Sequence, residues 1–320
     1  MTEAEPTAET VESPMSVDEA GDVARRVIEN TERVIIGNHD AIEHFVAAVL
    51  SRGHVLLEDV PGVGKTMLAR AIAKSLECSF KRVQFTPDLL PADITGTNVF
   101  NQETREFEFR PGPVFANVVL GDEINRAPPK TQAALLEAME EGTVTVDGTT
   151  HTMPDPFLVV ATQNSVERDR TYELPAAELD RFMMKLHLGY PDADEESRVL
   201  ASVVGDHPIE TLDPVATVGD LVAARRTTAA VTVEEPVRDY VTALARYTRE
   251  NAQLGVSPRG SISLLRAAQG RAVLDGRDYV IPDDVQAEAR NVFVHRIRTA
   301  SGAGTAAELV DAALSSVGVP

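Results

Sequence analysis

The sequence predicts an α/β fold in which a parallel β-sheet carries helices on both faces and is followed by a smaller α-helical domain. Three observations predict this fold. Short, continuous apolar runs alternate with helical patterns up to about residue 191, as they do in parallel sheets that are buried on both faces. A glycine-rich loop at 58–66 joins one of these runs to a helix, and beyond residue 192 only helical patterns occur.

The chain divides by composition into three parts. Residues 1–15 are rich in acids and proline and contain no basic residue, which predicts a disordered acidic tail. We expect a core domain at 16–191 and a helical lid domain at 192–320. A capping-box pattern begins at Ser16 and starts the first helix of the core, which we expect to reach about Asn30.

Apolar runs and helical periods place the remaining elements in order. A second helix presents an apolar face between Ile42 and Leu50. The expected strands lie at 54–57, 81–85, 117–120, 157–160 and 185–188, with helices at 65–77 and 130–141. The helices expected in the lid domain lie at 193–204, 218–226, 235–254, 260–274, 282–299 and 304–316.

Two hairpins interrupt this alternation of strands and helices. Residues 143–146 and 149–152 alternate in polarity and flank Asp147-Gly148, which is a strong signal for a two-residue turn. Residues 98–109 alternate more weakly around a polar middle, and they predict a second hairpin on a weaker signal.

The net charge of −20 and the single cysteine limit the function classes. So acidic a chain argues against a generally basic nucleic-acid-binding surface, although a small basic channel is compatible with this charge. Cys78 has no partner thiol or clustered histidine, so we expect it to pack a helix and not to bind metal. No apolar run is long enough to span a bilayer and the N-terminus has no leader pattern, so we expect a cytoplasmic protein.

The strongest functional signal is the glycine-rich loop between an expected strand and an expected helix. It ends in Gly64-Lys65-Thr66, as phosphate-binding loops do, but Asp59 stands where that pattern has its first glycine. Backbone N–H groups from Gly62 onward and the positive end of the helix can still bind phosphate oxygens. Lys65 would neutralise charge between the β- and γ-phosphates, and the Thr66 hydroxyl would ligate Mg²⁺.

Polar side chains end two further strands. Asp122 and Glu123 follow an apolar strand, which would bring them to the edge where open α/β sheets bind ligands. Asp122 would hold Mg²⁺ through water, and Glu123 would polarise the attacking water. Asn164 ends the next strand and could orient that water or contact the γ-phosphate. No Asn-Lys-x-Asp motif for reading guanine occurs, so we expect Mg²⁺-dependent hydrolysis of ATP.

Together these residues resemble the AAA+ ATPases, which share the Gly-Lys-Thr loop, the strand-borne Asp-Glu pair and the asparagine. Three longer stretches are more narrowly similar to the MoxR family: QFTPDLLPADITG at 84–96, DEINRAPPKTQ at 122–132 and LPAAELDRF at 174–182. The resemblance covers about residues 17–318. It implies that the core domain is a P-loop AAA+ core and that the helical domain is its lid.

The resemblance implies roles for two arginines and a glutamine. Arg181 matches the arginine finger, which stabilises charge on ATP bound to the neighbouring subunit, although a helix end alone also favours an arginine there. Arg259, at the start of a lid helix, matches the sensor that reaches the γ-phosphate from the lid. The helix dipole disfavours an arginine at that point, so we expect an anionic partner. Gln84 would restrain Glu123 as a polar switch residue.

The resemblance also extends the nucleotide site toward the adenine base. Ile36 and Gly37 fit the segment that packs against adenine, although a plain core isoleucine explains Ile36 nearly as well. The expected nucleotide-binding residues are Ile36, Gly37, Pro61, Gly62, Val63, Gly64, Lys65, Thr66 and Met67.

A finger that acts on a neighbour implies a ring of identical subunits, and the family suggests a hexamer. The hairpins match insertions that usually line the pore of such a ring or face its substrate. Hydrolysis would change the angle between core and lid and so act on a bound client protein. The job that the resemblance implies is chaperone-like maturation of protein complexes or metal insertion, often with a partner that carries a von Willebrand A domain.

Two other function classes remain as alternatives. Helicase-like AAA+ motors share the hairpin at 143–152, but its tip here carries no lysine or arginine and the chain is acidic. A nucleotide-gated scaffold without turnover would have no need of the intact Lys65, Glu123 and Arg181. Residues 165–170 are more charged than is usual in the family, and their arginines either face a neighbouring subunit or are ordinary solvated charges.

Overall fold

The computed structural model describes residues 14–164, 172–202, 204–205 and 207–320. The charged segment at 165–170 and nearly all of the tail predicted at 1–15 therefore lie outside the described residues. Across the described ranges, no helix combines the length and the apolar composition that crossing a lipid bilayer requires.

Five parallel strands form the central sheet, in the order β2-β5-β8-β1-β9. Their bounds are β1 (Val55–Asp59), β2 (Phe80–Gln84), β5 (Val118–Asp122), β8 (Leu158–Asn164) and β9 (Met184–Leu186). Each strand expected from an apolar run is present. Strand β1 pairs with β8 on one side and with β9 on the other, so the strand that leads into the phosphate loop is interior to the sheet.

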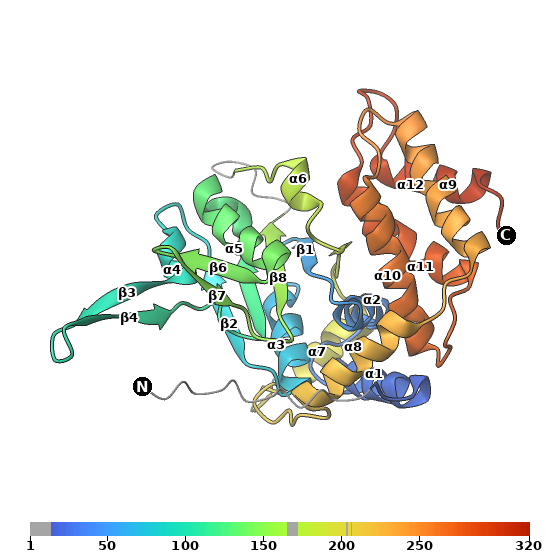
Figure 1. Cartoon of the computed structure of the whole chain (residues 1–320). Coiled ribbons are helices and arrows are strands. Elements are labelled where there is room, and N and C mark those ends of the chain that lie inside the picture. The colour runs from blue at the N-terminus through green and yellow to red at the C-terminus, as the bar shows by residue number, and fades with distance from the viewer. Residues whose placement is uncertain (1–13, 165–171, 203, 206) are drawn as a thin grey trace.

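Both faces of the sheet are buried, which explains the continuous apolar runs. Val55 and Leu57 of β1 belong to one apolar cluster, and Leu56 between them belongs to the cluster on the opposite face. The first cluster includes buried residues of α1 (Val17–Glu32), α2 (His39–Leu50) and α3 (Lys65–Ser75), and the second those of α5 (Pro129–Glu141) (Figure 1). Cys78 packs against the first cluster, and burial raises the pKa of its thiol to about 11.

Helices alone follow β9 in the described residues, and they pack onto the N-terminal helices of the core (Figure 1). They are α7 (Ala193–Ser202), α8 (Val218–Ala230), α9 (Glu235–Asn251), α10 (Pro258–Leu274), α11 (Pro282–Phe293) and α12 (Ala306–Ser316). The helix expected at 282–299 ends early, and a 3-10 turn, η2 (Val294–Arg296), follows it. The buried Arg296 guanidinium donates to the carbonyls of Phe182 and Met183, a tertiary contact that periodicity does not reveal.

Two one-turn elements were not predicted, because a single turn has no detectable period. They are α4 (Pro91–Thr95) and η1 (Ile124–Arg126). A third short helix, α6 (Ala176–Leu179), lies just before Arg181, where the sequence suggested a helix end without giving bounds. The first predicted helix, in contrast, begins where expected. Ser16 caps α1 and exchanges hydrogen bonds with Glu19 in the predicted capping box.

Both predicted hairpins are present, and they are joined to each other. One consists of β3 (Gly96–Asn101) and β4 (Glu106–Pro111), and it projects from the core (Figure 1); the other consists of β6 (Thr143–Val146) and β7 (Thr149–Thr152). Phe109 stacks on His151 with ring centroids 3.8 Å apart, and Asn98 Nδ2 donates to Asp147 at 2.9 Å. The exposed pair Phe100 and Phe107 lies farther out on the first hairpin.

A partly buried ion pair joins α2 to α11. His44 Nδ1 lies 2.9 Å from both carboxylate oxygens of Glu288, whose side chain has no exposed surface. Burial acts to lower the pKa of His44, and so does Arg271. The hydrogen bond and charge of Glu288, helped by Asp40, outweigh both, so the pKa of His44 is raised above its ordinary value.

This pair makes stability depend on pH. Because the pKa of His44 is higher in the folded than in the unfolded chain, its contribution is fully present below about pH 6.5 and is lost as pH rises through the folded value. We expect the difference in Tm between the natural chain and the His44→Gln variant to be largest at acidic pH and to shrink toward alkaline pH. Thermal unfolding between pH 5.5 and pH 9 measures it. A difference that is constant or grows with pH would contradict the assignment.

Candidate functional site

A cavity of about 340 Å³ lies where strands β1, β5 and β8 end. Most residues that line it were predicted as site residues. It is lined by Pro61, Gly62, Gly64, Lys65, Thr66, Met67, Asp122, Glu123, Thr162, Gln163 and Asn164. The fold therefore brings the Gly-Lys-Thr loop, the Asp-Glu pair and the asparagine together, although they lie far apart in the sequence.

The phosphate loop gives the cavity its positive side. Gly64 caps α3 with a φ of +96°, a left-handed conformation that glycine adopts without steric cost, and the helix begins at Lys65. The Lys65 ammonium donates to the backbone carbonyls of Asp59 at 2.6 Å and Val60 at 2.9 Å. Burial lowers the pKa of Lys65, against the opposing effect of the nearby carboxylates. The N-terminus of α3 and this ammonium form a site suited to an anion.

Asp59, the irregular residue of the loop, has a structural partner. Its carboxylate accepts hydrogen bonds from the backbone N–H groups of Val60 at 2.8 Å, Leu188 at 2.8 Å and Gly189 at 2.7 Å. Burial opposes ionisation, but these three donors outweigh it and lower the pKa of Asp59. Asp59 therefore joins the start of the phosphate loop to the chain that leaves β9, a role that a glycine cannot fill.

Asp122 is buried and held from two sides. The Thr162 hydroxyl donates to one carboxylate oxygen at 2.5 Å, and Arg82 donates to the other from Nε at 3.0 Å and Nη2 at 2.6 Å. Neither residue was predicted. Thr162 was visible only as a polar residue beside Asn164 at the end of a strand, and Arg82 carried no signal because its partner is on another strand.

Glu123 has a left-handed backbone, with φ 56° and ψ 51°, which is uncommon for a residue with a side chain. Its N–H donates to the Thr162 hydroxyl at 2.9 Å, so the same threonine fixes both members of the Asp-Glu pair. Gln84 Nε2 donates to the Glu123 carboxylate at 2.8 Å, the contact expected of a switch residue. Arg126 also lies 3.1 Å from that carboxylate.

The oxygen donors in the cavity suit Mg²⁺. The Thr66 hydroxyl and the Asp122 carboxylate line the same space, next to the loop that would hold phosphate. This pair of oxygen donors fits Mg²⁺, which uses one or two protein oxygens and completes its shell with phosphate and water.

The residues expected at the adenine base do not line this cavity. Neither Ile36 nor Gly37 belongs to its lining. Val63, which was expected to bind the nucleotide as part of the phosphate loop, packs against the apolar core. The buried Ile35 approaches the loop instead: its Cδ1 would lie 3.7 Å from a Cβ at Gly64. Gly37 has a φ of +87°, which favours glycine, and a Cβ there would meet the movable carboxylate end of Glu195 on α7.

Arg181 and Arg259 lie together, but neither lines the cavity. Arg181 follows α6, and its Nη2 lies 3.1 Å from Glu140 Oε2. Arg259, in the first turn of α10, pairs with the other oxygen of the same carboxylate. Glu140 is thus an anionic partner of Arg259 within the chain, whereas the anion expected from the sequence was the γ-phosphate.

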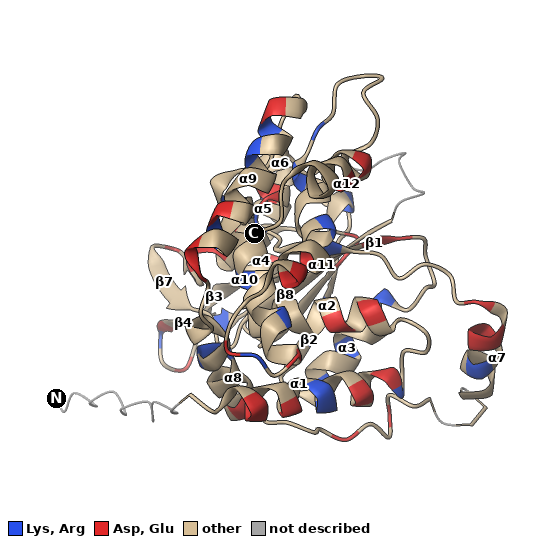
Figure 2. Cartoon of the chain, turned by 90° about the vertical axis from the view of Figure 1, so that its right-hand side faces the viewer, with Lys and Arg blue, Asp and Glu red and all other residues tan. Residues whose placement is uncertain are grey.

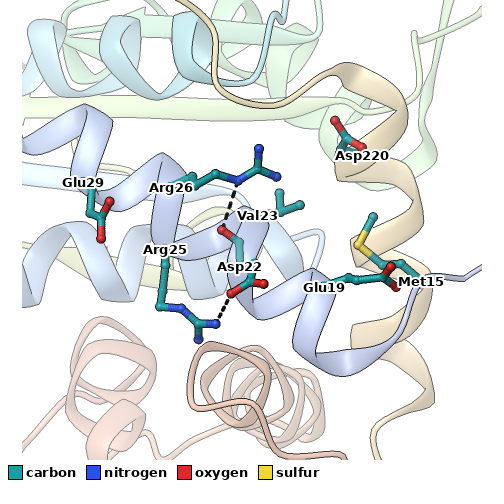
Figure 3. A pocket seen from close by; sticks show the side chains of 8 residues that line it. All are labelled: Met15, Glu19, Asp22, Val23, Arg25, Arg26, Glu29 and Asp220. Atoms are coloured by element: carbon teal, nitrogen blue, oxygen red, sulfur yellow. Dashed lines mark hydrogen bonds and ion pairs between the residues drawn. The ribbon is translucent and has the colours of Figure 1, made fainter.

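A second cavity, of about 560 Å³, lies between α1 and α8 and has a different character. Figure 3 shows its charged lining, in which Arg25 pairs with the Asp22 carboxylate and Arg26 donates to the Asp22 carbonyl at 3.4 Å. It contains none of the predicted site residues, so we place the functional site at the smaller cavity.

The charged residues of the chain are distributed over many helices. In Figure 2, blue basic segments alternate with red acidic ones along the helices on the side that faces the viewer.

The comparisons with known proteins show which family shares this fold. Residues 54–184 match the family model "ATPase family associated with various cellular activities (AAA)", and residues 244–313 match the model of the AAA lid domain. A crystal structure of a candidate ATPase from Cytophaga hutchinsonii superimposes with a TM-score of 0.87 at 36% identity, over 94% of this chain and 96% of that one. The fold and the site thus define an ATPase of the AAA+ class with a helical lid.

Two curated relatives narrow the class further. Protein YeaC of Bacillus subtilis, described as uncharacterized, is 54% identical over 85% of this chain and 86% of its own length. Chaperone MoxR1 of Mycobacterium tuberculosis is 42% identical over 85% of this chain and 74% of its own length. The chain belongs to the MoxR family of AAA+ ATPases.

Proposed function

We propose that the cavity at the end of β1, β5 and β8 binds ATP with Mg²⁺ and hydrolyses its γ-phosphate. One observation carries this proposal: Lys65, Thr66, Asp122 and Glu123 line a single cavity at the edge of a parallel sheet. The positive end of α3 would meet the phosphates there, and Glu123, which has a left-handed backbone, lines the same space.

Each residue has a distinct role in this proposal. The loop and the Lys65 ammonium bind the phosphates, and Lys65 exchanges its present carbonyl partners for phosphate oxygens. Thr66 and Asp122 would hold Mg²⁺, which neutralises phosphate charge when bound. Glu123 accepts a proton from the attacking water, and Asn164 orients that water. Gln84 holds the Glu123 carboxylate until ATP is in place.

The active form in this proposal is a ring of identical subunits, with a hexamer as the expected size. Arg181 supports it, because this arginine does not line the cavity of its own chain and would serve a neighbour's ATP. The ring would use hydrolysis to remodel a client protein, in maturation or metal-cofactor insertion, with a von Willebrand A domain protein as an expected partner. The exposed Phe100 and Phe107 on the projecting hairpin offer an apolar contact for such a client.

The nucleic-acid motor is the weaker alternative. The tip of the β6–β7 hairpin is Asp147-Gly148, and Asp147 accepts a hydrogen bond from Asn98 of the other hairpin. A carboxylate at that tip repels phosphate backbones.

Metal removal and added DNA test the proposal together. We expect phosphate release from ATP by the full chain to require Mg²⁺, to stop when EDTA is added and to recover when excess Mg²⁺ is restored. Added single- or double-stranded DNA is expected to leave the rate unchanged. A rate that rises strongly with DNA would favour the motor, and ATP binding without any turnover would favour the scaffold.

A further inference from the structure

Arg181 and Arg259 share one carboxylate although they belong to different parts of the chain. Glu140, in the last turn of α5, pairs through Oε2 with Arg181 and through Oε1 with Arg259. Arg181 also donates from Nη1 to the Leu136 carbonyl, at 2.6 Å, one turn earlier on α5. The Arg181 guanidinium is therefore fixed at two points on one helix, and Glu140 provides the charged one.

The backbones that carry the two arginines are fixed to each other as well. Asp180 accepts a hydrogen bond from the Ser257 hydroxyl at 2.8 Å and from Arg296 Nε at 2.7 Å. Ser257 is the cap of α10, two residues before Arg259, and Asp180 directly precedes Arg181. The buried Arg296 thus connects the segment after α6 to the lid. The spacing between Arg181 and Arg259 is therefore fixed twice, by the hydrogen bonds of the neighbouring Asp180 and by the carboxylate that the two arginines share.

The charges explain why a carboxylate is needed between them. Two guanidinium groups that approach one point repel each other, and Arg259 also lies at the positive end of α10. About a third of the Glu140 side chain is exposed, so water screens this repulsion only in part. A glutamine at position 140 keeps the shape and one acceptor oxygen but removes the charge that holds both cations.

We infer that Glu140 is a positioning residue for the finger role of Arg181. The inference rests on the proposed ring ATPase, in which Arg181 approaches ATP of the neighbouring subunit. Glu140 touches no nucleotide in this proposal; its carboxylate, which Arg259 shares, sets where the Arg181 guanidinium lies.

Steady-state kinetics of the assembled chain test it. The Glu140→Gln variant is expected to lower kcat for ATP about tenfold through misplacement of Arg181, and to leave KM unchanged because other residues bind ATP. Glu140→Asp should recover part of the loss. Glu141→Gln removes the same charge from the adjacent, exposed position of α5 and is expected to leave kcat as it is. A fall in Tm without a fall in kcat would show a merely structural role and overturn the inference.

The decisive comparison combines substitutions. If Glu140 acts through Arg181, the double variant Glu140→Gln/Arg181→Ala loses no more activity than Arg181→Ala alone. If the two losses multiply, Glu140 acts through another group, and the inference is wrong. Should Glu140→Gln fail to fold, Glu140→Asp serves instead: it is expected to lower kcat in the natural chain and to add no loss in the Arg181→Ala background.

Failure of the inference can be told from failure of the proposed function. If Arg181→Ala lowers turnover but Glu140→Gln leaves kcat unchanged, Arg181 acts as a finger and the positioning role of Glu140 is wrong. If Arg181→Ala itself leaves turnover intact, both the finger role and this inference are wrong.

Discussion

Replacing Glu123 with glutamine is expected to lower ATP turnover by a factor of about 10² or more, because the amide cannot accept the proton of the attacking water. ATP binding should remain, since the phosphate loop, Lys65 and Thr66 are untouched. Glutamine can still accept hydrogen bonds from Gln84 and can occupy the same left-handed backbone, so the local structure is expected to persist. The variant should therefore trap the ATP-bound state.

Two measurements separate binding from hydrolysis in this variant. Phosphate release reports turnover, and equilibrium binding of a fluorescent ATP analogue reports affinity. Glu58→Gln is the matched control, because Glu58 lies near the end of β1 and pairs with Lys185 at 2.6 Å without lining the cavity. If Glu123→Gln turns over ATP as fast as this control, the assignment of Glu123 as the general base is wrong.

Replacing Arg181 with alanine is expected to lower turnover by a factor of about 10³, the lower range for loss of an arginine finger. The substitution leaves the cavity of its own subunit complete, so each subunit should still bind ATP. The measurement is again phosphate release, alongside sedimentation to establish that the ring still assembles. A fully active Arg181→Ala ring would remove the finger from the mechanism.

Mixing variants shows whether the site is shared. Arg181→Ala subunits keep an intact cavity, and Lys65→Ala subunits keep an intact finger, so mixed rings should regain activity at some interfaces. The matched control mixes Arg181→Ala with the double variant Lys65→Ala/Arg181→Ala, which supplies no finger and should regain nothing. No recovery at any mixing ratio, with mixed assembly demonstrated, would contradict action between subunits.

Much of the fold and of the cavity could be predicted because the signals are local. Gly64-Lys65-Thr66 follows a strand and starts a helix, and Asp122 and Glu123 end a strand, so parallel pairing alone brings them to one edge. The Asp147-Gly148 turn was visible for the same reason, since its signal occupies two residues.

The remaining contacts could not be predicted because they join side chains that are far apart in the sequence. Thr162 bonds to Asp122 across two neighbouring strands, and nothing in its surroundings distinguishes it from other strand threonines. Asp59 appeared as a departure from the loop pattern, and only the structure shows that it binds the backbone after β9. Glu140 is one of several glutamates on α5, and its two arginines come from later segments of the chain.

The stacking of Phe109 on His151 couples the β3–β4 and β6–β7 hairpins, so we expect them to move together as one arm. That arm is rooted in α5, because β6 begins at Thr143, directly after the Gly142 cap that ends the helix. A pull on the first hairpin would therefore act on the last turn of α5 through the stacked rings. Glu140 lies in that turn, so we expect a client bound at the hairpins to affect the contact between Glu140 and Arg181.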